Sequence, residues 1–176
     1  MKNKRKWLKH KKKILPLILV ALALVVVFYY YILPSFFTIP DLSTHGFSPV
    51  TVDLDVGEDE GTLIFDSECY EISMTITKDQ VVSIQNGING VIDYRPNTHD
   101  LMNDMLKNLG AEILMVKITE MQDSVYIAKI LIKKGNLILS LDSRPSDAIA
   151  IAARTEYFID IYVNDTLLET MGEKIC

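Results

Sequence analysis

The longest apolar run of the chain lies near its N-terminus and contains no charged residue. It covers residues 14–33 and reads ILPLILVALALVVVFYYYIL. As a helix rising about 1.5 Å per residue, a run of this length spans about 30 Å, the thickness of a bilayer's hydrocarbon core. The tyrosines Tyr29, Tyr30 and Tyr31 suit the membrane–water interface. We therefore predict one N-terminal transmembrane helix over residues 14–33.

Two other interpretations of this run are a buried core helix and a cleaved signal peptide. A core helix of this length without charge is unusual. The apolar region of a signal peptide is usually about 7–15 residues long and is followed by a small-x-small cleavage site. Here the run is longer and LPSFFTIP follows it, so the sequence favours an uncleaved anchor.

Beyond the anchor, the pattern of apolar positions predicts a tether, a folded domain and a short tail. Residues 34–49 contain three prolines and no clear periodicity, which is typical of a tether. Residues 50–163 are dense in alternating apolar patterns, and we predict one compact domain there. We predict a C-terminal tail over residues 164–176.

The domain is expected to contain seven strands and two or three helices. Alternation with period two, as in VTVDLDV, predicts strands at 50–56, 62–65, 70–77, 113–119, 125–132, 137–141 and 159–163. Helices are expected at 98–109 and 146–154, while Gly87 and Gly90 mark either a break or a tightly packed helix start. Strands in runs with helices between them indicate an α+β fold with a mixed or antiparallel sheet.

The predicted helix over 98–109 has the clearest start and end signals. Thr98 can cap it, Asp100 suits its first turn, and Gly110 can end it in the left-handed conformation. One stripe of this helix is apolar, formed by Leu101, Met102, Met105, Leu106 and Leu109. In the segment KKGN, Gly135 can supply the positive φ of a hairpin between the last two strands before the second helix.

Charge is strongly segregated along the chain. Residues 1–13 contain eight of the 18 basic residues and no acid, whereas the remainder carries all 23 acidic residues and a net charge of −13. The basic tip, 1–13, precedes the anchor, and the first basic residue after the anchor is Lys78. The positive-inside rule then places the tip in the cytoplasm and the domain outside, in a single-pass protein of the cell membrane.

The presence of two cysteines is compatible with a domain outside the cytoplasm, but it does not require a disulfide. Cys176 is the last residue of the chain and is expected to be mobile. We therefore expect Cys69 and Cys176 to remain unpaired within the chain, although one bridge is open to them.

The common catalytic signatures are absent from the sequence. It contains no phosphate-binding Walker loop, no zinc-binding HExxH helix, no CxxC pair and no GxSxG elbow. Of the three histidines, His10 lies in the tip and His45 in the tether, which leaves His99 for the folded domain. A site with two histidines would need a second chain, and a homo-oligomer remains open.

Two short segments combine arginine, proline, a hydroxyl and aspartate at helix starts: RPNTHDL, residues 95–101, and DSRPSDAI, residues 142–149. Helix N-termini bind anions, and arginine recognises phosphate through two hydrogen bonds. An aspartate beside a histidine can bind a divalent cation such as Mg²⁺ or activate water. The candidate catalytic residues are His99, Asp100, Arg144 and Asp147, with Asp100 and Asp147 also candidate metal ligands. Candidate substrate contacts are Arg95, Thr98 and Ser146.

A purely structural interpretation of the same residues stays open. Thr98 and Asp100 are common capping residues, and Pro145 with Ser146 and Asp147 is a common helix start. Arg144 would then pair with Asp147 or Asp100 to fasten two helix ends. In that interpretation His99 is a satisfied structural residue.

The motifs THDL at 98–101 and RPSDAIAIAAR at 144–154, in this order and separation, resemble the bifunctional nuclease domain family. The resemblance is specific over residues 95–163 and weaker over 50–94. It implies a compact α+β domain with nuclease activity on DNA and RNA in some plant members. The matching positions are Thr98, His99, Asp100, Asp123, Tyr126, Arg144, Pro145, Ser146 and Asp147.

The sequence departs from the family pattern in one respect that bears on activity. Where relatives carry a glutamate in an EAxAI helix, Ile88 or Asn89 stands here. In addition, the net charge of −13 should repel a polyanion, so nucleic acid is a disfavoured partner unless an Arg95, Arg144 and Arg154 patch or a cation compensates. The expected function is therefore membrane-anchored hydrolysis of phosphodiester bonds in DNA or RNA. The alternative is a noncatalytic extracytoplasmic module that binds a protein or a small anionic ligand.

Overall fold

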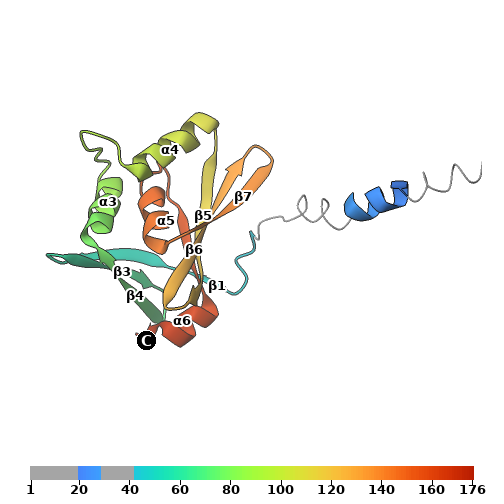
Figure 1. Cartoon of the computed structure of the whole chain (residues 1–176). Coiled ribbons are helices and arrows are strands. Elements are labelled where there is room, and N and C mark those ends of the chain that lie inside the picture. Colours follow the sequence, from blue (N-terminus) through green and yellow to red (C-terminus); the bar gives the residue numbers. More distant parts are fainter. Residues whose placement is uncertain (1–19, 29–41) are drawn as a thin grey trace, which may run out of the picture. The chain divides into compact units, whose positions relative to one another are not determined.

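A computed structural model of the chain describes residues 20–28 and 42–176 (Figure 1). Residues 20–28, within the predicted anchor, are helical. The rest of the predicted anchor, the basic tip and residues 34–41 of the predicted tether lie outside the described residues. Within the described ranges, no helix is long and apolar enough to span a bilayer. The described residues from 42 to 176 belong to a compact unit of their own, which we describe by itself.

Two β-sheets build the domain. The first has five strands in the order β1-β8-β5-β6-β7, and the second has four in the order β2-β3-β4-β9. The first sheet is formed by Phe47–Pro49, Asp160–Asn164, Glu112–Gln122, Val125–Lys134 and Leu137–Ser143. The second is formed by Thr51–Val56, Glu60–Asp66, Tyr70–Thr77 and Glu173–Lys174.

The pairing of these strands confirms the predicted mixed and antiparallel character. β5 and β8 run parallel, with Met115 opposite Asp160, whereas all other neighbours are antiparallel. The turn between β6 and β7 holds Gly135 at a φ of 57°, as the KKGN segment predicts. A second tight turn, between β5 and β6, places Asp123 and Ser124 at positive φ.

The four helices of the domain are α3 (Lys78–Ile88), α4 (Thr98–Leu109), α5 (Pro145–Ala152) and α6 (Asp165–Met171). α4 matches its predicted bounds and ends at Gly110, whose φ is 62°. The fold class is therefore the predicted α+β, with one helix more than the two or three expected. Figure 1 shows α3, α4 and α5 grouped on one side of the strands that include β5 and β6.

α5 lies at the centre of the core. Seven of its eight residues are buried, and it contacts α3, α4, β5 and β6. Its small side chains, Ala148, Ala150 and Ala152, let the neighbouring elements approach closely. Around it the core is formed by apolar side chains of both sheets and of α3, α4 and α6: Leu63, Phe65, Ile72, Val81, Ile84, Leu106, Val116, Ile118, Ile130, Val163 and Leu168.

The segment predicted as a tail, residues 164–176, contains α6 and β9. Leu167 and Leu168 of α6 are buried, and β9 pairs with β4 so that Lys174 lies opposite Tyr70. This pairing brings the end of the chain beside Cys69. The expectation of unpaired cysteines is wrong, because Cys69 and Cys176 form a disulfide with their Cα atoms 4.9 Å apart.

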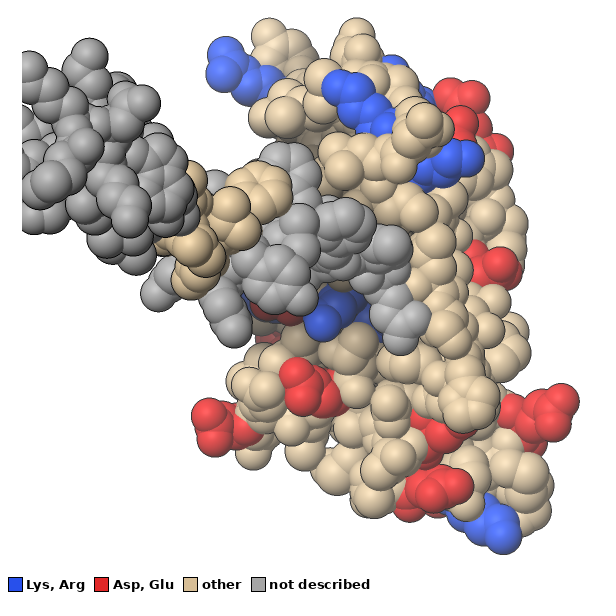
Figure 2. All heavy atoms as spheres, turned by 90° about the vertical axis from the view of Figure 1, so that its right-hand side faces the viewer, with Lys and Arg blue, Asp and Glu red and all other residues tan. Residues whose placement is uncertain are grey.

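The charges on one face of the domain are unevenly distributed. In Figure 2, most of the basic side chains lie toward the end where Figure 1 places α4 and the β6–β7 turn, next to a few acidic ones, and most of the acidic side chains lie toward the opposite end. Lys133 and Lys134 flank that turn and are exposed. This face therefore carries a local basic region on a domain that is acidic overall.

Candidate active site

The two helix starts singled out in the sequence meet in space. His99 of α4 and Asp147 of α5 are 48 residues apart, and the Nε2 atom of His99 lies 3.3 Å from Oδ1 of Asp147. Both side chains are partly exposed, at 20% and 26%. A site that uses both segments is therefore geometrically available.

A helix cap at the start of α4 fixes the backbone position of His99. Asn97, rather than the predicted Thr98, is the N-cap, and its side chain accepts hydrogen bonds from the backbone N–H groups of His99 and Asp100. The Asp100 carboxylate accepts in return from the backbone N–H of Asn97 at 2.8 Å. Reciprocal bonds of this kind satisfy N–H groups that a helix start leaves free. His99 is therefore placed at a rigid position of the first turn.

The other ring nitrogen of His99 contacts a serine that the sequence analysis did not select. Nδ1 lies 2.8 Å from the hydroxyl of Ser83, which is in the middle of α3. Since Nε2 faces the Asp147 carboxylate, it carries the proton in the neutral ring, and Nδ1 accepts from the Ser83 hydroxyl. Hydroxyl, imidazole and carboxylate thus form one continuous hydrogen-bonded chain.

Asp147 is fixed by Arg144 as well as by His99. Arg144 donates from Nε and Nη2 to the two carboxylate oxygens, at 2.7 and 3.0 Å. Partial burial acts to raise the pKa of Asp147, but the hydrogen bonds from Arg144 and His99 outweigh it and hold that pKa below its ordinary value. Asp147 is therefore ionised at neutral pH, while the Arg144 side chain remains 65% exposed.

Asp100 has a different partner from the one expected. Its carboxylate pairs with Arg154, whose Nε donates at 2.5 Å, and the two side chains are only 6% and 5% exposed. Burial acts to raise the pKa of Asp100, but the hydrogen bonds from Arg154 and Asn97 keep that pKa below its ordinary value. Arg154 also donates to the carbonyls of Ser83 and Ala150. Arg154 is thus a buried structural cation, so it does not contribute to the patch with Arg95 and Arg144 that could have offset the acidic charge.

The packing around Arg154 explains one of the two glycines noted in the sequence. Gly87 lies in the last turn of α3, and a Cβ atom there would come within 2.8 Å of Nη1 of Arg154 and 3.1 Å of Cβ of Ala153. Gly87 therefore belongs to a tightly packed helix contact between α3 and α5. Gly90, with a φ of 63°, lies just past the end of that helix.

The contacts do not support a metal ion shared by Asp100 and Asp147. One oxygen of Asp100 accepts from Arg154 and the other from the Asn97 N–H, whereas both oxygens of Asp147 accept from Arg144. A carboxylate with both oxygens already bound to cationic or N–H donors is a poor ligand for a divalent cation. Within residues 20–28 and 42–176, no group of three or more histidine, cysteine, aspartate or glutamate side chains could hold a metal.

An open pocket of 280 Å³ lies against His99 and Ser83. Its walls come from α3, the loop before α4 and the first turn of α4. Seven of its eight lining residues are of polar types: Asp79, Val82, Ser83, Asn86, Asp93, Asn97, Thr98 and His99. Thr98, a candidate substrate contact, is exposed there. The hydroxyl–imidazole–carboxylate chain therefore borders a space that a small ligand or part of a larger one can enter.

The remaining candidate residues lie away from this pocket. Ser146 is buried, and its hydroxyl accepts a hydrogen bond from the Gln80 side chain at 2.8 Å, so it joins α5 to α3. Arg95 is exposed in the loop before α4 but does not line the pocket. Asp123 forms the β5–β6 turn, and burial raises the pKa of the half-buried Tyr126 in the next strand.

Ser83 escaped the sequence analysis because α3 was not predicted. The pattern VVSIQNGI places Val81, Ile84 and Gly87 on one buried face, and Thr77 with Gln80 forms a capping box before it. The signal that could have found the helix is this capping box, a threonine followed three residues later by glutamine. Ser83 occupies the same buried face and is only 8% exposed.

The arrangement is suited to moving a proton. An imidazole held between a hydroxyl and an ionised carboxylate can take a proton from the hydroxyl side while the carboxylate stabilises the imidazolium that forms. Arg144 lies on the same carboxylate and presents exposed N–H groups that suit a phosphate or carboxylate oxygen. The site thus combines a base with an anion-binding cation.

Comparison with known proteins shows the family to which the chain belongs. A family model described as the bifunctional nuclease domain matches residues 63–175. The matched segment contains α3, α4 and α5, and with them Ser83, His99, Arg144 and Asp147. The chain belongs to the bifunctional nuclease domain family.

Individual relatives match over a shorter stretch. Bifunctional nuclease 1 of Arabidopsis thaliana and its namesake in Oryza sativa subsp. japonica are each 34% identical over 84 residues, which is 46% of this chain and 25% of theirs. The uncharacterized protein Rv1829 of Mycobacterium tuberculosis is 34% identical over 83 residues, 47% of this chain and 48% of its own. The chain therefore spans about half the length of the mycobacterial relative and a quarter of the plant ones.

Proposed function

We propose that this protein is a membrane-anchored hydrolase of phosphodiester bonds in DNA or RNA, with His99 as its general base. The observation that carries the proposal is the position of His99 between Ser83 and Asp147, at 2.8 and 3.3 Å, on the wall of an open pocket. The plant relatives that are 34% identical over 84 residues are named bifunctional nucleases, which supports the choice of substrate.

In the proposed reaction a water molecule in the pocket attacks the phosphorus atom. Ser83 is too deeply buried to be the nucleophile itself, but its hydroxyl lines the pocket. The hydroxyl passes its proton to Nδ1 of His99 and takes one from the attacking water. Asp147 stabilises the resulting imidazolium, which then returns this proton through the Ser83 hydroxyl to the leaving oxygen as the ester bond breaks. Arg144 lies outside the pocket lining, and in the proposal its exposed guanidinium contacts a phosphate oxygen of the substrate that extends beyond the pocket.

The decisive experiment compares the wild-type chain with an Asp147→Asn variant on single-stranded DNA and RNA. Both proteins are purified identically in detergent, so that a contaminating nuclease would cleave equally in both preparations. Circular dichroism checks that both proteins are folded. Arms with Mg²⁺, Mn²⁺ and EDTA are included because the carboxylates of Asp79 and Asp93 line the same pocket. Cleavage that is lost in the variant would support the enzyme. Equal cleavage by both proteins would refute it.

A noncatalytic binding module is the second candidate, and the charge of the pocket favours it. Two aspartates but no lysine or arginine line that pocket, and Arg144 is already paired with Asp147. A polyanion such as DNA or RNA gains little electrostatic attraction from such a surface at long range. Absence of cleavage in every arm, with both proteins folded, would make this module the better description.

We also propose that residues 14–33 anchor the protein in the membrane with the domain outside the cytoplasm. The uncharged run, the basic tip before it and the Cys69–Cys176 disulfide support this arrangement, because disulfides persist in oxidising compartments. Protease added to intact cells should remove the domain while a tag on the N-terminus stays protected. Protection of the domain would contradict the proposed orientation.

A further inference from the structure

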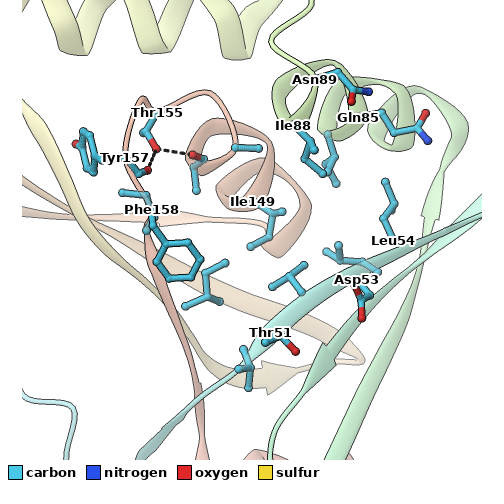
Figure 3. Close-up of a pocket in the computed structure, with 18 residues that line it drawn as sticks. Thr51, Asp53, Leu54, Gln85, Ile88, Asn89, Ile149, Thr155, Tyr157 and Phe158 are labelled. Atoms are coloured by element: carbon cyan, nitrogen blue, oxygen red, sulfur yellow. Dashed lines mark hydrogen bonds between the residues drawn. The ribbon is translucent and has the colours of Figure 1, made fainter.

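A second cavity is lined by a different set of residues from the His99 pocket. It has a volume of 780 Å³ and opens between β2, the C-terminal ends of α3 and α5, and the segment 155–159 (Figure 3). Its walls are mainly apolar and include Leu54, Ile88, Ile149 and Phe158. None of the residues that line the His99 pocket lines this cavity.

The cavity runs along the edge of a strand. Five consecutive residues, from Val50 to Leu54, line it, although successive side chains of a strand point to opposite faces. A cavity that touches all five borders the backbone along the strand's edge, and Leu63 and Ile84 in the same lining show that it also reaches the inner face. In the described part of the chain β2 is the terminal strand of its sheet and pairs with β3 alone.

The pairing register shows which backbone groups face the cavity edge. Gly57 donates to the Glu60 carbonyl at the hairpin turn, so residues 55, 53 and 51 form the hydrogen-bonded pairs with β3. The N–H and C=O groups of Val52 and Leu54 therefore point away from β3. On the same side, the N–H of Val50 donates to the carbonyl of Ile161, which also lines the cavity. Among the described residues, the edge of β2 is thus paired at Val50 and has no partner strand at Val52 and Leu54.

Large apolar side chains stand exposed around this edge. Phe158 is 88% exposed and Ile88 is 64% exposed, and both belong to the cavity lining. In Figure 3 they lie on two different sides of the cavity, with Leu54 near the end of α3 and Ile149 between them. Exposed apolar side chains gathered around a concave space mark a binding surface rather than ordinary surface.

The acidic residues along the β2 edge indicate which kind of partner can bind there. Asp53 and Asp55 are exposed on β2, and the turn that follows contributes Glu58, Asp59 and Glu60. A second copy of this chain paired edge to edge through β2 would bring these aspartates against one another, which is unfavourable. Lysine or arginine side chains on the added strand would be attracted instead.

We propose that the β2 edge binds an extended peptide by strand addition, and that the peptide alternates basic with large apolar side chains. Its backbone pairs with Val52 and Leu54, its apolar side chains enter the cavity beside Ile88 and Phe158, and its basic side chains face Asp53 and Asp55. Backbone pairing supplies affinity in such complexes, and pockets for alternate side chains supply specificity. This site is independent of the proposed hydrolysis at His99.

The test uses the full chain in detergent and a fluorescent synthetic heptapeptide in which lysine alternates with valine, phenylalanine and valine. Fluorescence anisotropy should show saturable binding. A peptide with glutamate in place of lysine, and one N-methylated at alternate backbone positions, should each bind at least ten-fold more weakly. The N-methylated peptide retains its charge but can no longer donate to the strand.

Variants test the protein side of the same contact. Asp53→Lys with Asp55→Lys should weaken the lysine peptide at least ten-fold and strengthen the glutamate peptide. Phe158→Ala should weaken binding about five-fold, whereas Tyr94→Ala, a fully exposed aromatic outside the cavity lining, should leave it unchanged. Circular dichroism and a thermal melt confirm that each variant is folded.

Three results would overturn the proposal. The first is an absence of saturable binding with the wild-type chain. The second is equal binding of the N-methylated peptide, which would mean adsorption through side chains only. The third is self-association through β2, detected by sedimentation and competing with the peptide, which would make a second copy the occupant.

Discussion

Arg154 and Asp100 form a buried ion pair between elements that are 54 residues apart in the sequence. Nε of Arg154 donates to the Asp100 carboxylate at 2.5 Å, and neither side chain is more than 6% exposed. Because Arg154 also donates to the Ser83 carbonyl in α3, one guanidinium joins α3, α4 and the residues after α5. The three helices that position the candidate site are thus fastened together beneath it.

Removal of either partner of this pair should destabilise the fold strongly. Arg154→Ala or Asp100→Asn leaves a buried group without its partner, which costs about 3–5 kcal/mol in comparable cases. The free energy of unfolding in urea measures the effect. The matched control is the exposed pair Lys107–Glu156, where Lys107→Ala should change that free energy by less than about 0.5 kcal/mol. Equal effects at the two pairs would contradict the structural role of Arg154.

Acid should destabilise the domain through two carboxylates at the site. The pKa values of Asp100 and Asp147 are held below their ordinary value of 3.8 by hydrogen bonds that outweigh burial. The unfolded chain therefore binds protons first as the pH falls, and stability that is complete above about pH 5 is lost as the pH passes through 3.8 toward the folded-state pKa.

Urea unfolding between pH 3 and pH 7 measures this loss. In Asp147→Asn the slope of stability against pH should be smaller in the acid range, by up to about 1.4 kcal/mol per pH unit. Glu156→Gln is the control, since its partner is exposed and salt screens the pair. An unchanged slope in Asp147→Asn would show that its pKa is not lowered in the folded state.

Loss of the disulfide should destabilise the domain. The bond closes a loop with a sequence separation of 107 residues, and a loop of that size corresponds to about 2–5 kcal/mol of stability. Cys69→Ser should show this decrease in urea unfolding under oxidising conditions. The double variant with Cys176→Ser should match the single one, because either change removes the same bond. A single variant as stable as the wild type would show that the bond does not contribute.

The sequence predicted the elements whose signals are local. The helix over 98–109 has a capping box, an apolar stripe and a C-terminal glycine, and the strands alternate regularly. α3 was missed because Gly87 reads as a break, and only its contact with Arg154 and Ala153 explains a glycine inside a helix. α6 and β9 were missed because a short helix and a two-residue strand depend on packing against β4 and β8.

The site was predicted in part, for a related reason. His99, Arg144 and Asp147 lie at helix starts with recognisable composition, and the structure brings them together. Ser83 has no such signal, because a serine inside an amphipathic helix is ordinary until its partner is known. Asp100 was assigned a metal, but its buried partner Arg154 lies 54 residues away, and no local pattern links the two.

The most direct test of the central claim is the rate of phosphodiester cleavage by His99→Gln. Glutamine keeps a polar side chain of similar reach between Ser83 and Asp147 but cannot serve as a base at neutral pH. The rate on single-stranded DNA and RNA, per folded molecule, should fall at least about 100-fold. Urea unfolding, run alongside, should show a loss smaller than that of Arg154→Ala. An unchanged cleavage rate in folded His99→Gln would contradict the assignment of His99 as the general base.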